Sequence, residues 1–262
     1  MKRFLLLFIA VLISLNFMTC EKIKSKEEKK PQKTIVVLFD LSESTRNLKK
    51  VYSDSFKTIL SSIGHGDVIV AAKITNSSIS EPEIPIKKEF PEFVPTDKMG
   101  NRTDNPILVE KSLKEANKKL ADEKARLEKI SNDILLVKED IYRKILNTDI
   151  VSSLHVAEKI FKNYKRNHTI LVIFSDMIED SKEYNFEKEN LTDKRIEDII
   201  KKEKLRNRIP DLQGVKIYVV AAGTKESNKF FAIQNFWLRY FKECGADLSK
   251  ERYGSALLNF NE

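Results

Sequence analysis

From residue 35 the chain reads Ile35-Val36-Val37-Leu38-Phe39-Asp40-Leu41-Ser42-Glu43-Ser44. A continuous apolar run of this length predicts a strand that is buried on both faces. The oxygen-bearing residues Asp40, Ser42 and Ser44 follow it at positions i, i+2 and i+4, on a loop that leads into a helix. Hard oxygen ligands that converge on one point suit Mg²⁺ or Mn²⁺. The stretch therefore predicts a divalent-metal site at the end of a buried strand.

Apolar runs alternate with helical patterns along the rest of the chain. Strands are predicted over residues 34–39, 67–74, 169–174, 215–221 and 255–260, and helices over 48–63, 150–164, 193–206 and 227–244. Such alternation indicates a mostly parallel sheet with helices on both faces. The predicted fold class is α/β, with a doubly wound sheet.

Two further groups of oxygen ligands are expected at the same edge of that sheet. Asp176 follows the strand at 169–174, and the cluster Asn147-Thr148-Asp149 precedes the helix that leads into this strand. Ligands of open α/β sheets bind beyond the carboxyl ends of the strands. Asp40, Asp176 and the cluster are therefore expected to share one rim.

With these residues in order, the chain resembles the von Willebrand factor A family and its metal-ion-dependent adhesion site. The family motif D-x-S-x-S corresponds to Asp40, Ser42 and Ser44, its later Thr to Thr148, and its late Asp to Asp176. The resemblance covers most of residues 34–260. It implies the family's Rossmann-like fold, Mg²⁺ or Mn²⁺ as cofactor, and a protein partner that offers an acidic group.

Three departures from the family pattern leave alternatives open. Glu43 stands where the family often has a small residue, so it either repels an incoming carboxylate or points to solvent. Met177 stands where the family often has Gly. Thr103 competes with Thr148 for the Thr position, but no strand follows Thr103 at the needed distance.

Helix capping is the alternative to metal binding in the first loop, because Ser and Asp are favoured at helix starts. Capping accounts for one or two hydroxyls but not for Thr148 and Asp176. Glu179 and Asp180 come soon after Asp176 and are predicted to be charges on the rim, not ligands.

The start of the chain has the pattern of an export signal. Met1-Lys2-Arg3 precedes an uncharged stretch over residues 4–19, which is short for a spanning helix. The stretch ends in Phe17-Met18-Thr19-Cys20, which resembles the lipobox of bacterial lipoproteins and implies lipidation of Cys20, although Phe17 and Thr19 are not the family's preferred residues. The alternatives are cleavage with release and an uncleaved anchor. In all three cases the remainder of the chain is exported. Lipidation predicts a membrane-anchored lipoprotein of the bacterial cell envelope that faces the periplasm or the exterior.

Residues 1–20 are thus assigned to the signal peptide, 21–33 to a charged tether and 34–262 to one folded domain. The tether lacks the apolar residues that folding requires, and its mean reach is about 20 Å. The net charge of +8 is interpreted as a generally basic surface. No basic stripe interleaved with aromatics predicts nucleic-acid binding.

An insertion over about residues 97–146 separates the second strand from the Thr148 loop. Apolar residues recur in it every seven positions, at Leu113, Leu120, Leu127, Ile134 and Ile141. This period predicts a coiled-coil-like helix about 60 Å long, with a turn at Ser131-Asn132-Asp133 if it folds back. A dimerisation arm or docking surface and an intramolecular hairpin are equally compatible with the pattern.

The leading hypothesis for function is an exported protein-binding module for adhesion through its metal site. The alternatives are an envelope assembly protein that acts through the inserted helix, with a vestigial metal site, and a metal-dependent hydrolase. The sequence has no nucleophile elbow or Gly-rich phosphate loop, so an enzyme is not expected. Cys244 is predicted to be a buried thiol, and the aromatic residues of the last helix are predicted to pack in the core.

Overall fold

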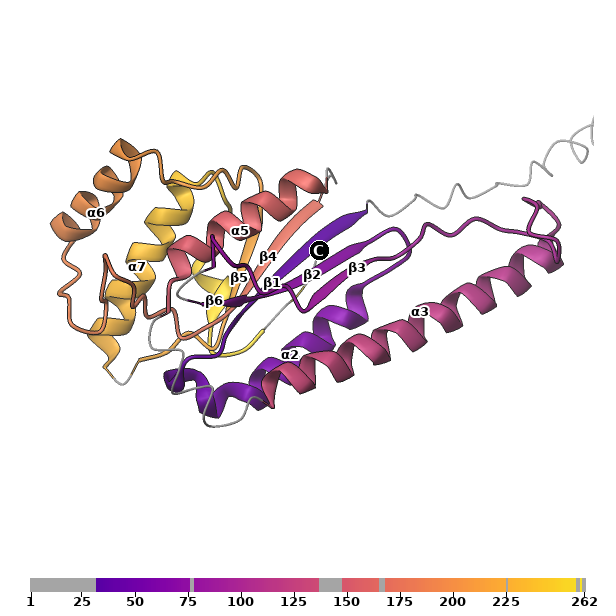
Figure 1. Ribbon diagram of the computed structural model, residues 1–262, viewed down its shortest axis with the longest axis horizontal. Helices are drawn as coiled ribbons and strands as arrows, with labels where there is room; N and C mark the ends of the chain where they lie inside the picture. Colours follow the sequence, from indigo (N-terminus) through magenta and orange to yellow (C-terminus); the bar gives the residue numbers. More distant parts are fainter. Residues whose placement is uncertain are drawn as a thin grey trace, which may run out of the picture. The chain divides into compact units, whose positions relative to one another are not determined.

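A six-stranded sheet runs through the computed structural model in the order β3-β2-β1-β4-β5-β6 (Figure 1). The model describes residues 32–75, 78–136, 148–164, 168–224, 226–257 and 260. The strands are β1 (Lys33–Asp40), β2 (Val68–Ile74), β3 (Ile86–Glu89), β4 (His168–Phe174), β5 (Lys216–Val220) and β6 (Tyr253–Gly254). Every strand pairing within these ranges is parallel except that of β2 with the edge strand β3. The predicted mostly parallel sheet is confirmed.

Helices cover both faces of the sheet, as predicted for a doubly wound fold (Figure 1). On one face lie α2 (Lys49–Ser62), which follows the 3₁₀ helix η1 (Glu43–Leu48), and α3 (Pro106–Leu135). On the other lie α5 (Ile150–Asn163), α6 (Asp193–Leu205) and α7 (Ser227–Glu243), and a short 3₁₀ helix η2 (Lys250–Arg252) precedes β6.

Strand β1 is central, and all eight of its residues are buried. Its side chains alternate between the two cores: Val36 and Leu38 pack with α5 and α7, whereas Ile35, Val37 and Phe39 pack with α2. A strand covered on both faces needs apolar residues at every position, which explains the unbroken run in the sequence.

The last predicted strand is wrong in position and length. Pairing with β5 is limited to Tyr253 and Gly254, and no strand extends over 255–257 or at 260. The neighbouring strand β5 stops at Val220, because Ala221 turns out of the sheet with φ 71°. Phe260 packs its ring against Tyr218 instead, at 5.1 Å between centroids.

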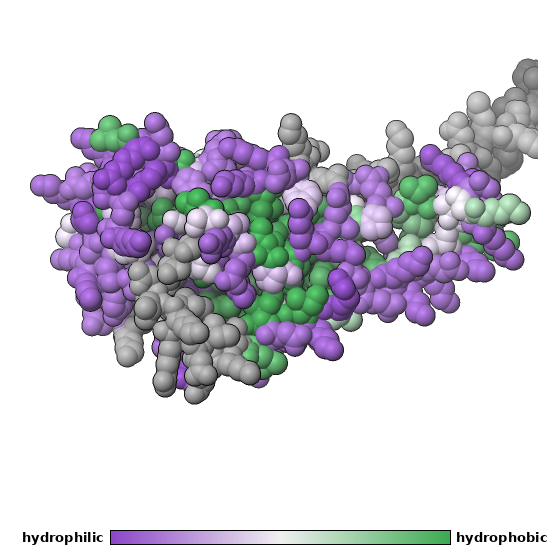
Figure 2. Space-filling model, viewed as in Figure 1, coloured by the Kyte–Doolittle hydropathy of each residue, from purple (hydrophilic) through white to green (hydrophobic). Residues whose placement is uncertain are grey.

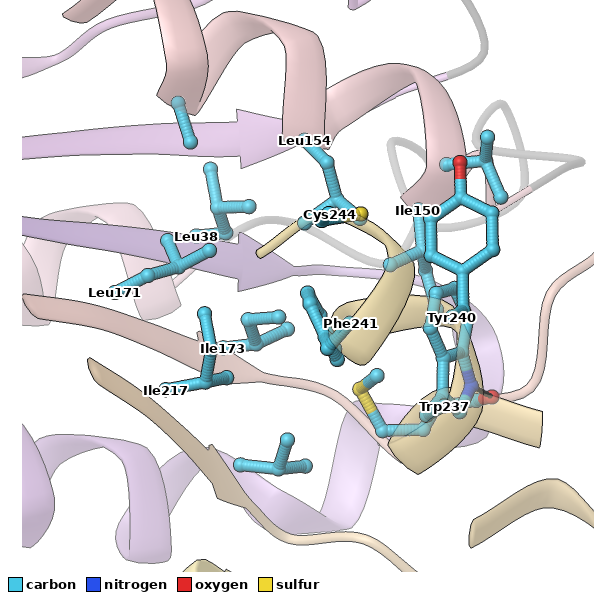
Figure 3. Packing of buried hydrophobic residues seen from close by; sticks show 14 of the residues in the cluster. Leu38, Ile150, Leu154, Leu171, Ile173, Ile217, Trp237, Tyr240, Phe241 and Cys244 are labelled. Carbon is cyan, nitrogen blue, oxygen red and sulfur yellow. Dashed lines mark hydrogen bonds between the residues drawn. The ribbon is translucent and has the colours of Figure 1, made fainter. Parts of the chain in front are cut away.

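The aromatic residues of α7 form core packing, as predicted. Phe241 points toward the sheet residue Ile173, Tyr240 and Trp237 lie near Ile150, and the buried thiol of Cys244 lies near Leu154 (Figure 3). Burial raises the pKa of that thiol well above its usual range. Outside this core, Phe231 on the same helix is 61% exposed.

Within the described residues, the inserted segment contains one helix, α3, of 30 residues and about 45 Å. The turn predicted at Ser131-Asn132-Asp133 is wrong, because α3 continues through these residues to Leu135. Packing on α2 explains the continuity: Ser131 is buried, and the Asn132 side chain accepts a hydrogen bond from Ser53 Oγ at 2.7 Å. Ile141, the last residue of the predicted repeat, lies outside the described residues.

Only the second half of α3 is packed along α2 within this domain. Leu127 and Ile134 are buried, Leu120 is partly buried, and Leu113 is 38% exposed. Glu128 in this half pairs with Lys57 of α2 at 3.5 Å, whereas Asn117 in the first half hydrogen-bonds His65, just after α2, at 3.0 Å. The apolar residues of the seven-residue repeat therefore pack against the rest of the domain mainly in the second half of α3.

Leu127→Ala is expected to lower the free energy of unfolding by about 2–4 kcal/mol, because it opens a cavity between α3 and α2. Leu113→Ala, the same change two repeats earlier, is expected to cost less than about 1 kcal/mol. Urea denaturation of both variants measures the difference. Equal losses would show that the first half of α3 is buried as well, in a contact with another molecule.

Candidate metal centre

Asp40 ends β1, and its carboxylate is buried. The carboxylate accepts hydrogen bonds from the backbone N–H of Ser42 at 2.9 Å and from Ser175 Oγ at 2.7 Å. Ser175 lies beside Asp40 because β1 and β4 pair in register, with Phe39 opposite Phe174. Ser175 was not among the predicted site residues, although its place directly after the strand that neighbours β1 was the available signal.

The serine hydroxyls of the first loop face one another and Asp176. Ser42 Oγ and Ser44 Oγ are 3.1 Å apart, and the Ser44 side chain hydrogen-bonds Asp176. Ser42 stands at the N-cap of η1 but makes no side-chain cap hydrogen bond. Thr45 Oγ1 instead donates to the carbonyls of Asp40 and Ser42, at 2.9 Å each. Capping therefore does not account for the position of the Ser42 hydroxyl.

Asp176 leaves the end of β4 on a loop with an unusual backbone conformation. Met177 has φ 65°, in the left-handed region that favours Gly, and it is the position where the family often has Gly. Its N–H donates to Ser175 Oγ at 2.9 Å, and its carbonyl accepts from Trp237 Nε1 at 2.9 Å. These contacts and the burial of its side chain hold a Met in a conformation that usually selects Gly.

The two carboxylates form a buried pair of like charges. Burial, and next the charge of Asp40, raise the pKa of Asp176 to about 6. Burial also raises the pKa of Asp40, against the opposing effect of its hydrogen bonds. Within the described residues neither carboxylate forms an ion pair with Lys or Arg. Two buried carboxylates with serine hydroxyls between them are a donor set that fits Mg²⁺ or Mn²⁺.

Thr148 lies on the same rim, and backbone pairing holds it there. Its carbonyl accepts the N–H of Asp180 at 2.9 Å, which joins it to the loop that carries Asp176. Its hydroxyl takes no part in the side-chain contacts described above among Asp40, Ser42, Ser44 and Asp176. The competing Thr103 is placed elsewhere, since its N–H donates to the carbonyl of Pro95 at the start of the α3 segment.

Glu179 is a fully buried carboxyl group, so the prediction that it would be a charge on the rim is wrong. Its Oε2 accepts the N–H groups of Ile150 and Val151, at 2.8 and 3.2 Å, at the start of α5. Burial, and next the charge of Asp149, raise its pKa well above the usual range. The prediction failed because the loop after β4 folds inward, where sequence spacing alone suggested an exposed loop.

The remaining predicted residues do not contact the carboxylate pair. Glu43 is exposed and lies 3.4 Å from Arg46, so of its two alternatives the structure supports the solvent-facing one. Cys20 lies outside the described residues. Over the described ranges, no group of three or more His, Cys, Asp or Glu side chains forms a metal cluster, so carboxylates supply only two donors here. No helix there is both long and apolar enough to cross a membrane.

Comparison with solved structures finds von Willebrand factor A domains. Matches include the domain of SpRpn10, at 10% identity over 86% of this chain and 87% of that chain, with a TM-score of 0.35. A von Willebrand factor type A structure from Catenulispora acidiphila matches at 9% identity over 84% and 44%, with a TM-score of 0.39. This chain is similar to von Willebrand factor A domains in its fold alone.

Another similar structure is an aerotolerance-related membrane protein from Bacteroides fragilis, at 12% identity over 75% of this chain and 74% of that chain, with a TM-score of 0.33. No protein-family model and no curated protein matches the sequence. Identities this low concern the fold alone. Conclusions about the candidate metal centre therefore rest on the residues of this chain.

Without metal, the domain is expected to lose stability as pH rises through about 6. The folded-state pKa of Asp176 is raised from 3.8, so its stabilising effect is present below about 3.8 and is lost by about 6. In Asp176→Asn the melting temperature should therefore change less between about pH 5 and about pH 8 than in the wild type.

Thermal melting in EDTA measures this pH dependence. Asp198→Asn, on the exposed face of α6, is the matched control and should retain the wild-type dependence. Identical pH dependence in Asp176→Asn and the wild type would contradict the buried like-charge pair.

Proposed function

We propose that this protein is an exported, lipid-anchored interaction module, not an enzyme, whose bound Mg²⁺ or Mn²⁺ joins it to an acidic group of a partner protein. The observation that supports this most is the buried pair Asp40 and Asp176, which has no Lys or Arg ion pair among the described residues. Two buried anions are costly unless a cation compensates them.

The residues divide into charged and neutral ligands. Asp40 and Asp176 would hold the ion directly or through water, and the hydroxyls of Ser42, Ser44 and Thr148 would complete its surroundings without adding charge. Only two negative charges then face a divalent ion, and a bound ion of this kind supplies an electrophilic point for an outside carboxylate. The solvent-facing Glu43 leaves that approach unobstructed by its own charge.

The envelope location and the membrane anchor rest on the export signal and on Cys20. Lipidation there would attach the domain to a bilayer through residues 21–31. A protein held in this way meets partners at a surface, where even a modest affinity is raised by the high effective concentration. This setting suits a module that recognises a partner by one charged group.

Mg²⁺ or Mn²⁺ is expected to raise the melting temperature of a Glu21–Glu262 fragment, because an ion that binds only the folded state stabilises it by mass action. The rise should disappear in Asp40→Ala and persist in Asp198→Ala, which changes an exposed carboxylate of α6. Differential scanning fluorimetry with EDTA, Mg²⁺, Mn²⁺ and Ca²⁺ makes the measurement. A well-folded wild type with no shift in any metal would indicate a vestigial site.

Partner capture is expected to require the metal. A partner isolated with the wild-type domain in Mg²⁺ should be lost in EDTA and with Asp40→Ala, by at least about tenfold in affinity. Binding that survives both treatments but is lost when exposed residues of α3 are changed would support the alternative of an assembly protein that acts through α3.

A further inference from the structure

The first half of α3 extends past the end of α2. Lys124 Nζ donates to the carbonyl of Ser61, at 3.3 Å, in the final turn of α2, and farther along α3 the side chain of Asn117 hydrogen-bonds His65, three residues after α2, at 3.0 Å. Residues 106–116 continue for about 16 Å beyond the contact of Asn117. Figure 1 shows this half of α3 extending away from the sheet on the side where β1 begins.

A small hairpin and the first turns of α3 form the end of this extension, and we call residues 94–114 the tip. Thr96 pairs with Arg102, and Gly100 donates its N–H to the carbonyl of Asp97 to close the turn. Met99 at its apex is 89% exposed, and Ile107 in the first turn of α3 is 77% exposed. Among the described residues, Met99 is the most exposed large apolar side chain, and Ile107 and Leu205 are equally exposed in second place.

Basic side chains flank Met99 at the apex and continue into the first turns of α3. The exposed basic residues of the tip are Lys98, Arg102, Lys111 and Lys114. Asp97 accepts the N–H groups of Met99 and Asn101 at 2.9 Å each, and the other acidic residues of the tip, Asp104 and Glu110, are exposed, so basic side chains outnumber acidic ones by four to three. Figure 2 shows hydrophobic atoms at this end among hydrophilic ones. Exposed apolar groups beside Lys and Arg are the combination that binds the interface of anionic bilayers.

The anchoring segment joins the domain close to the tip. Gln32 Nε2 hydrogen-bonds Glu92 Oε1, and Glu92 stands seven residues before Met99, so Gln32 is within about 25 Å of the apex. Residues 21–31 separate Gln32 from Cys20, and eleven residues span at most about 40 Å. A lipid on Cys20 would thus hold this end of the domain within reach of the bilayer.

We infer that the tip docks on the membrane that holds the anchor, with Met99 and Ile107 in the headgroup region and the basic residues against anionic headgroups. The inference rests on the proposed lipid anchor. Tethering raises the effective concentration of the tip at the bilayer, so a weak contact is sufficient. Because Asp40 ends β1 and Lys33 begins it, the metal centre then faces away from the membrane, toward a partner.

The test attaches the folded domain to vesicles without using Cys20. A Glu21–Glu262 fragment contains both hydrophobic cores of the domain, and an N-terminal hexahistidine binds it to phosphatidylglycerol vesicles that carry a nickel-chelating lipid. A polarity-sensitive dye is placed at Met99→Cys, at Ile107→Cys or, as control, at Phe231→Cys. Phe231 is 61% exposed on the first turns of α7, which start at the opposite edge of the sheet. The buried Cys244 does not compete for the dye.

Vesicles are expected to raise the dye emission at positions 99 and 107 by about twofold or more, with a blue shift, and to leave position 231 unchanged. Equal responses at all three positions, or no response at 99 and 107, would overturn the docking. A response at 99 that appears without vesicles as protein concentration rises would also overturn it, since a second copy would then cover the tip. Mass spectrometry of Cys20 in the membrane-extracted chain tests the anchor separately, so failure of either result identifies which proposal is wrong.

Discussion

The mutual repulsion of two buried carboxylates is the constraint on which this domain depends. Asp40 ends β1 and Asp176 lies two residues beyond the end of β4, so the register of these adjacent strands brings both carboxylates to one edge of the sheet. Protein groups relieve part of the repulsion: Ser175, the Ser42 N–H and Ser44 donate hydrogen bonds to the pair. Hydrogen bonds do not supply a positive charge, so the compensating charge must come from outside the described chain or from protons.

The packing of the sheet holds the two carboxylates in place. A strand buried on both faces cannot slip by one residue without exchanging its two sets of side chains between two different cores. The alternation of Val36 and Leu38 with Val37 and Phe39 therefore fixes the height at which Asp40 emerges. Packing from α7 acts in the same way on the other strand, since Trp237 holds the carbonyl of Met177 next to Asp176.

Sequence reasoning predicted the parts of the fold that are set by local pattern. The four longer parallel strands and the helices α2, α5, α6 and α7 follow from apolar periodicity, and their ends differ from prediction by a residue or two. The errors arose where tertiary contacts decide. Asn132 is a poor helix former in isolation, but its bond to Ser53 keeps it within α3. The β6 pairing ends early because Ala221 leaves the neighbouring strand, which no feature of residues 255–260 reveals.

The candidate site was predictable to a similar extent. Spacing after the strands placed Asp40, Ser42, Ser44 and Asp176 together, because parallel strands end at a common edge. It did not reveal Ser175, which depends on the pairing register, or the burial of Glu179, which depends on how the loop after β4 folds.

Glu179 joins the loop after β4 to the start of α5. One carboxyl group binds the N–H groups that open α5, directly after Thr148, and belongs to the loop that begins with Asp176. The two loops are thereby fixed to each other when the chain folds. An arriving ion would meet a preorganised site, so little of its binding energy would be spent on ordering the protein.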